Sequence, residues 1–130
     1  MSISIVRLGS PRRPGEGLRL GTVRRPPRGV PRSEFATQNW YDVWFPNLAP
    51  SPDTLKRGLA AKTSAEWAGF AKCYRAEMKK PPAQHDLALL AALSKSADFS
   101  VGCYCADESR CHRSLLRELL LKAGAEVLPG

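Results

Sequence analysis

Three of the four cysteines and one of the two histidines lie within ten positions, in the segment CYCADESRCHRS from Cys103 to Ser114. Thiols and imidazoles are the side chains that bind zinc, act as nucleophiles and transfer protons near neutral pH. The spacing therefore predicts a functional site in this segment, and it leaves the kind of chemistry open.

A metal site is the first possibility, with Cys103, Cys105, Cys111 and His112 as the ligands. Their types and number suit a closed tetrahedral zinc site. Their spacing is unlike that of the commonest zinc modules, because Cys-x-Cys replaces Cys-x2-Cys and the last two ligands are adjacent.

Thiol chemistry is the second possibility, with Cys111, His112 and Cys105 as catalytic candidates. A helix amino terminus and the neighbouring Arg110 and Arg113 would lower the pKa of a thiol and favour the nucleophilic thiolate. The third possibility is purely structural, with small buried cysteines and arginines that hold a loop.

The expected local structure brings some of these side chains together. The run FSVGCYC after Asp98 predicts a buried strand, on which Cys103 and Cys105 point to the same face. A helix from Arg110 to Gly124 would direct His112 toward the sheet, with Asp107 or Ser109 as its cap. Ligands of open α/β sheets bind at the carboxyl ends of the strands, where Cys105 would lie.

The positive charge of the chain is concentrated at its start. Residues 1–32 contain eight arginines and one acid, so they carry +7 of the formal net charge of +8. Arginine pairs well with phosphate and carboxylate groups, so we expect Arg24, Arg28, Arg110 and Arg113 to bind an anionic small molecule or a nucleotide. The alternative is a non-enzymatic nucleic-acid-binding module in which the aromatic cluster of residues 40–45 stacks on bases.

The remaining patterns predict an α/β protein. Strands are expected at 2–8, 18–25 and 99–105, helices at 51–58, 63–80, 83–96 and 110–124, a short helix at 40–45, and a last short strand in AEVL at 125–128. The link at 9–17 is shorter than a parallel crossover requires, so the first two strands are expected to pair antiparallel. The predicted fold is a single small mixed, partly parallel β-sheet with helices packed on it and a Rossmann-like βαβ unit in the C-terminal half.

Length and composition predict one domain over residues 1–130, with 1–32 as an arginine-rich strand-loop-strand segment within it. The start of the chain shows no leader, and no apolar run is long enough to cross a bilayer. We therefore expect a cytoplasmic protein with reduced cysteines and no membrane partner. The oligomeric state is left open.

The motifs together resemble the domain-of-unknown-function 488 family, to which the YeaO-like proteins belong. The resemblance covers roughly residues 3–124 and rests on the Cys-x5-Cys-His-Arg-Ser turn, Arg24 followed by Pro27-Arg28-Gly29, Trp40, the Ala49-Pro50-Ser51 turn with Leu55, and Trp67, Phe70, Tyr74 and Glu77. The chain departs from the family pattern at Arg24-Arg25-Pro26, where an aspartate and a tryptophan are expected. The resemblance implies a fold and a site but no reaction.

Overall fold

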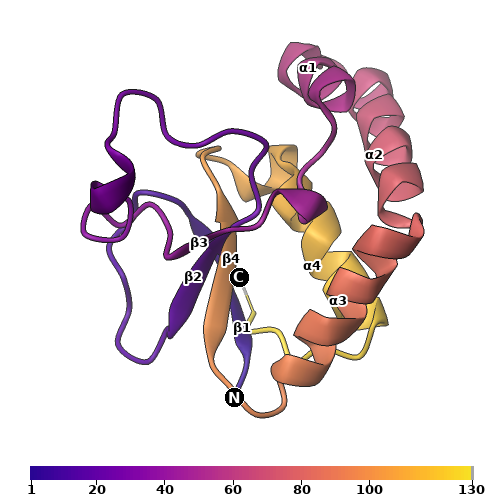
Figure 1. Ribbon diagram of the computed structural model, residues 1–130. Coiled ribbons are helices and arrows are strands. Elements are labelled where there is room, and N and C mark those ends of the chain that lie inside the picture. Colours follow the sequence, from indigo (N-terminus) through magenta and orange to yellow (C-terminus); the bar gives the residue numbers. More distant parts are fainter. Residues whose placement is uncertain (130) are drawn as a thin grey trace.

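The computed structural model describes residues 1–129 (Figure 1). Its strands are β1 (Ile3–Arg7), β2 (Leu18–Gly21), β3 (Val43–Trp44) and β4 (Phe99–Cys103). Its α-helices are α1 (Pro52–Ala60), α2 (Ser64–Met78), α3 (Pro81–Leu93) and α4 (His112–Lys122). Short 3-10 helices occur at η1 (Arg32–Glu34), η2 (Pro46–Leu48) and η3 (Glu108–Arg110).

The four strands form one sheet in the order β1-β4-β2-β3. Every neighbouring pair is parallel, and β4 pairs with β1 along its whole length. The carboxyl ends of β1, β4 and β2 therefore lie side by side at one edge of the sheet. The predicted α/β class is confirmed, and β4 and β2 form the central pair of the sheet.

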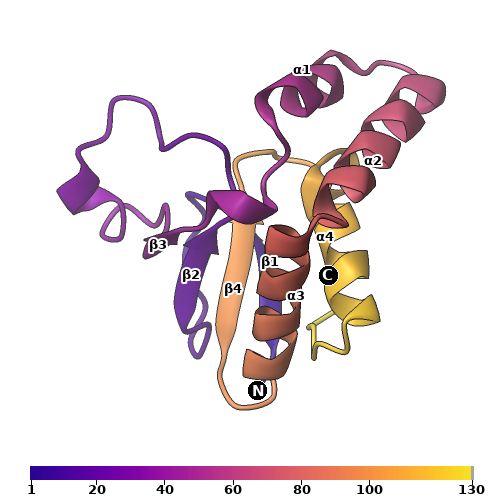
Figure 2. The same cartoon turned by 45° about the vertical axis from the view of Figure 1, so that its right-hand side comes forward.

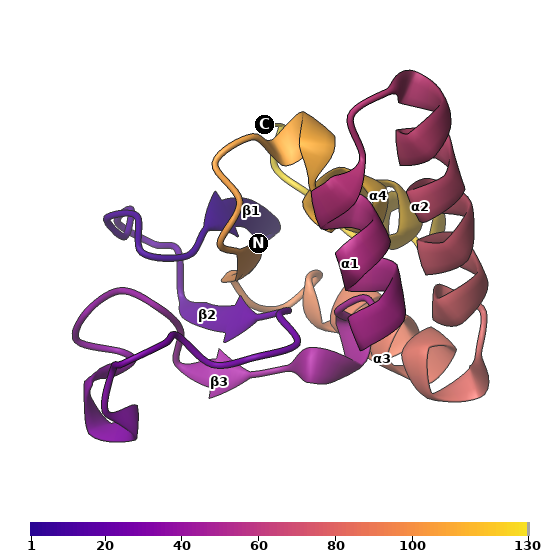
Figure 3. The ribbon, with the colours of Figure 1, turned by 90° about the horizontal axis from the view of Figure 1, so that it is seen from above.

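The helices lie on one side of the sheet, and the loops of residues 22–42 extend on the other side (Figures 2 and 3). The main core lies between sheet and helices. It contains Phe99 and Val101 of β4, Phe70 and Tyr74 of α2 and Leu116 of α4, all buried. Burial of these apolar side chains is the main force that holds the helices on the sheet.

The two helices expected to start near residues 51 and 63 are present, and each start is capped. Thr63 and Glu66 form a reciprocal capping box at the start of α2. The Ser51 side chain accepts a hydrogen bond from the Thr54 N–H at the start of α1. Both caps satisfy N–H groups that have no partner within the helix.

A buried ion pair organises the face of the sheet that lacks helices. Arg19 of β2 is fully buried, and it donates two hydrogen bonds to the Glu16 carboxylate at 2.8 and 3.1 Å. Glu16 also accepts a bond from the Ser100 hydroxyl, while Arg19 donates to the carbonyls of Ser10 and Asn39. The pair thus joins the 8–17 loop and the 39–42 turn to the sheet.

The antiparallel pairing expected for the first two strands is wrong. β4 lies between β1 and β2, and it runs parallel to both. The sheet is therefore parallel throughout and not mixed. Ten residues can extend over about 33 Å, which is enough to cross one strand and return along it without a helix.

Several element boundaries also differ from the prediction. Residues 40–45 form no helix, because the chain leaves a turn and adds the two-residue strand β3 to the sheet edge. The second strand ends at Gly21, and AEVL contributes a single parallel bridge between Val127 and Ile3. α4 begins at His112, two residues later than expected, and Asp107 caps η3 instead.

No helix among the described residues is both long enough and apolar enough to cross a membrane.

Candidate functional site

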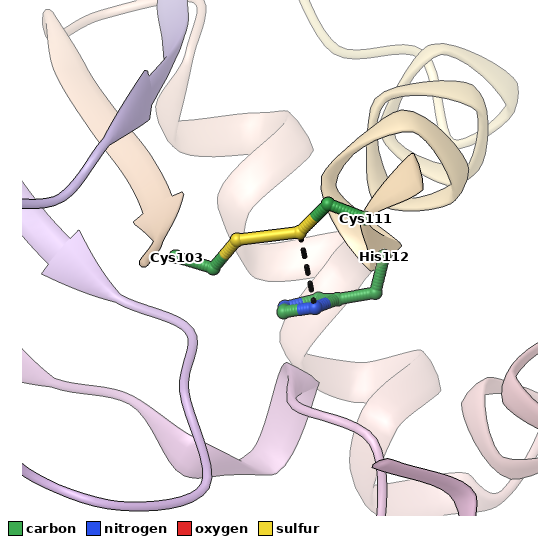
Figure 4. A group of neighbouring side chains, drawn as sticks. All are labelled: Cys103, Cys111 and His112. Carbon is green, nitrogen blue, oxygen red and sulfur yellow. Dashed lines mark hydrogen bonds between the residues drawn. A yellow bond between two sulfur atoms is a disulfide. The ribbon is translucent and has the colours of Figure 1, made fainter. Parts of the chain in front are cut away.

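Cys103, Cys111 and His112 converge at the junction of β4 and α4 (Figure 4). Cys103 is the last residue of β4, while Cys111 is the N-cap of α4 and His112 is its first residue. Cys111 has an extended backbone (φ −135°, ψ 153°), and the helix begins at the next residue, His112. All three side chains are buried, with exposures of 2%, 2% and 5%.

The hydrogen bonds of His112 define its tautomer. Its Nε2 lies 2.8 Å from the Thr22 backbone oxygen, which can only accept, so Nε2 carries the proton. Nδ1 then has a free lone pair, and it lies 3.7 Å from the Cys111 sulfur. Burial lowers the pKa of His112 to about 4, although the bond to Thr22 acts in the opposite direction. The imidazole is therefore neutral at pH 7, and Nδ1 is available as an acceptor.

The sulfur atoms of Cys103 and Cys111 are in direct contact and are drawn as a disulfide in Figure 4. Their Cα atoms are 7.9 Å apart. Disulfides usually join Cα atoms separated by about 4.4–6.8 Å. The backbone spacing of this pair is thus wider than that of most disulfides.

A cleft lies at the carboxyl edge of the sheet, with a volume of about 1110 Å³. Three arginines and two aromatic side chains supply its chemistry: Arg7, Arg25, Arg28, Trp40 and Tyr104. No carboxylate is among the described residues that line it. We call it the arginine cleft.

The arginine cleft and the buried cysteines are neighbours. Leu8 lines the cleft and belongs to the same apolar cluster as Cys103 and Cys111. Trp40 and Tyr104, which meet edge to face with ring centres 5.9 Å apart, pack against that cluster. The cysteine group therefore lies beneath one wall of the cleft.

Of four other predicted site residues, one lines the cleft and three lie outside it or outside the cysteine-histidine group. Arg28 lines the cleft, whereas Arg24 donates to the backbone oxygens of Ala49 and Pro50 and lies outside it. Arg110 is exposed on η3. Cys105 is partly buried and lies outside the converging group.

Arg113 is buried, with 4% of its surface exposed. One of its terminal nitrogens donates to the Cys105 backbone oxygen at 2.6 Å, while its Nε has no hydrogen-bond partner among the described residues. Burial lowers the pKa of Arg113, and the nearby Arg7 acts in the same direction. Within residues 1–129, Arg113 thus has no hydrogen bond to a carboxylate, and it lies beside the loop that follows β4.

Three residues of the cleft were not predicted from the sequence as site residues: Arg7, Arg25 and Tyr104. Arg7 ends β1 and donates to the Tyr104 carbonyl, while the Tyr104 hydroxyl donates to the Arg25 carbonyl. Their common signal is position, because each lies at or just beyond the end of a strand. These three residues can be assigned to one site only when it is known that β1 and β2 flank β4.

The fold and the site define a small α/β protein with a parallel sheet, a basic cleft at the carboxyl ends of its strands and a buried cysteine-histidine group. Residues 3–124 match the family model described as the active DUF488-N3 subclade. The chain therefore belongs to the DUF488 family, as the motifs predicted. No curated protein and no solved structure shows significant similarity to the chain.

Proposed function

We propose that this protein binds an anionic ligand of the nucleotide class in the arginine cleft. One observation carries the proposal: three arginines and two aromatic rings line a cleft that has no carboxylate among its described residues. The cleft also occupies the edge of the sheet where ligands of parallel α/β proteins bind.

The lining residues complement the two parts of a nucleotide. Guanidinium groups of Arg7, Arg25 and Arg28 can pair with phosphate oxygens. Trp40 and Tyr104 offer ring surfaces for a base, and stacking on an aromatic side chain contributes about 1–3 kcal/mol. The two halves of the cleft thus favour a ligand that is both charged and aromatic.

Calorimetric titration with AMP, adenosine and inorganic phosphate tests this proposal. We expect AMP to bind more tightly than either of its parts. Arg28→Ala should weaken AMP binding about tenfold, because a hydrogen bond to a charged group contributes about 1.5–3 kcal/mol.

Arg32→Ala is the matched control, since it removes the same charge from the same segment but lies outside the arginine cleft. AMP affinity should not change in this variant. The proposal is wrong if none of the three probes binds, or if Arg28→Ala and Arg32→Ala have equal effects.

A second candidate function is thiol-dependent catalysis by Cys111, supported by the 3.7 Å contact between its sulfur and the free Nδ1 of His112. Nδ1 is oriented to accept a hydrogen bond from the Cys111 thiol, which is the arrangement of a thiol and its general base. Alkylation with iodoacetamide, followed by peptide mass spectrometry, tests it. Catalysis requires that Cys111 reacts faster than Cys73, a partly buried thiol on α2.

A further inference from the structure

The cysteine-histidine group has the composition of a metal site. The ligand atoms of Cys103, Cys111 and His112 all lie within 4.8 Å of one another. They come from two elements, the end of β4 and the start of α4, so the fold and not a local sequence repeat brings them together (Figure 4).

The sulfur-to-nitrogen distance is close to the one that a tetrahedral zinc ion imposes, whereas the two sulfurs, now in direct contact, would have to separate to bind it. With Zn–S of about 2.3 Å and Zn–N of about 2.0 Å, a sulfur and a nitrogen ligand lie about 3.5 Å apart, and two sulfurs about 3.8 Å apart. The Cys111 sulfur is 3.7 Å from Nδ1 of His112. The Cα separation of 7.9 Å gives Cys103 and Cys111 room to hold their sulfurs on opposite sides of an ion.

The surroundings of His112 match those of a ligating histidine. Such a histidine almost always donates its second ring N–H to a carboxylate, a backbone carbonyl or a water, and this bond fixes the ring and the tautomer. Here Nε2 donates to the Thr22 backbone oxygen at 2.8 Å, which leaves Nδ1 directed at the sulfur of Cys111. This bond is an observation independent of the clustering.

The burial of both cysteines is compatible with metal ligation, because a metal ligand needs only to reach the ion. Cys103 and Cys111 are each 2% exposed and pack among Leu8, Val23 and Tyr41.

We propose that Cys103, Cys111 and His112 together bind one zinc ion. Two thiolates and one imidazole favour zinc over magnesium or calcium, which prefer oxygen ligands. Three protein ligands leave the fourth tetrahedral position to a water or a small molecule, the arrangement of catalytic rather than structural zinc sites. The proposal does not depend on which ligand the arginine cleft binds.

Metal analysis of the reduced full-length protein is the first test. After purification under reducing conditions without added metal, and after addition of one equivalent of zinc and desalting, we expect about one zinc per chain. Cobalt added to the metal-free wild-type protein should give a thiolate-to-cobalt charge-transfer band. This band appears only when cysteine coordinates the metal, so the test needs no variant. A reduced, folded protein that retains no zinc and gives no such band would falsify the proposal.

Variants then assign the ligands. Cys111→Ser and His112→Ala should each weaken zinc binding at least tenfold in competition with a chromophoric chelator. Cys73→Ser is the matched control and should bind zinc like the wild type, because Cys73 lies on α2, outside the group.

Cys105→Ser separates this site from the four-ligand site that the sequence suggested. We expect zinc to be retained in this variant, since Cys105 lies outside the converging group. Loss of zinc from Cys105→Ser, or unchanged binding in Cys111→Ser, overturns the three-ligand assignment. Circular dichroism of each variant establishes that it is folded before zinc is measured.

Discussion

At the scale of single residues, the arginines of the first segment have different roles despite their identical chemistry. Arg19 is fully buried and paired with Glu16, whereas Arg28 is exposed in the arginine cleft. Sequence patterns alone count both as positive charge. The difference arises because Glu16, the one acid among residues 1–32, reaches Arg19 three positions later and neutralises it.

Glu16→Gln should destabilise the protein by about 3–5 kcal/mol, because it leaves the buried Arg19 guanidinium without a counter-charge. Urea denaturation measures the change. Glu118→Gln is the control, since its pair with Arg75 is exposed (60% and 47%) and such a pair contributes about 0–1 kcal/mol. Equal losses in the two variants would contradict the assigned role of Glu16.

The same pair predicts how stability depends on pH. Burial raises the pKa of Glu16, but hydrogen bonds from Arg19 and Ser100 outweigh it, so the folded pKa lies below the ordinary value of 4.5. A lowered pKa means that the stabilisation is fully present above pH 4.5 and is lost as the pH falls through the folded pKa. Urea denaturation across this range should therefore show the difference between wild type and Glu16→Gln shrinking below pH 4.5.

At the scale of elements, the Leu48–Ser51 turn connects the sheet to α2. Arg24 donates to the carbonyls of Ala49 and Pro50, and the Tyr74 hydroxyl donates to the Leu48 carbonyl at 2.7 Å. The Glu77 carboxylate accepts bonds from the N–H and hydroxyl of Ser51. Three of the family motifs thus meet at this turn, and Arg24 has a structural role in it.

Tyr74→Phe should reduce stability by about 1–3 kcal/mol, because it leaves the buried Leu48 carbonyl without its donor. Tyr41→Phe is the matched control. Tyr41 is also buried, but its hydroxyl has no hydrogen-bond partner among the described residues, so its removal should be neutral or stabilising. Thermal denaturation compares the two, and a larger loss in Tyr41→Phe would contradict the assigned hydrogen bond.

The elements that could be predicted are those with local signals. Capping residues placed α1 and α2, and apolar runs placed β1 and β4, because these signals lie within one turn or one strand. The position of β4 between β1 and β2 depends on contacts across some 80–96 residues, such as Thr22 with Gly102. The short link after β1 permits direct antiparallel pairing of β1 with β2 as well as insertion of β4 between them. No local sequence pattern distinguishes these two arrangements.

At the scale of the whole molecule, the site was predictable only where it depends on residues that are close in the sequence. The convergence of Cys111 and His112 depends on neighbouring residues, and it was anticipated. The arginine cleft depends on three strand ends that meet only in the folded sheet, so Arg7 and Tyr104 were missed. Arg19 is the opposite case, because the folded protein buries it against Glu16 although it belongs to the arginine-rich segment.

The salt dependence of binding distinguishes a small-ligand cleft from a nucleic-acid surface. Among the described residues, the side chains of Arg13, Arg25, Arg28 and Arg32 make no hydrogen bond within the chain, so four arginines of the first segment remain free for phosphates. Single-stranded RNA held by all four would lose about 50-fold in affinity between 50 and 200 mM salt. AMP, held by one phosphate group and an aromatic contact, should lose less than about fivefold over this range.

Fluorescence anisotropy with a labelled RNA and calorimetry with AMP give the two slopes. Tight RNA binding with the steep slope, together with no measurable AMP affinity, would replace the nucleotide-cleft proposal with a nucleic-acid-binding one.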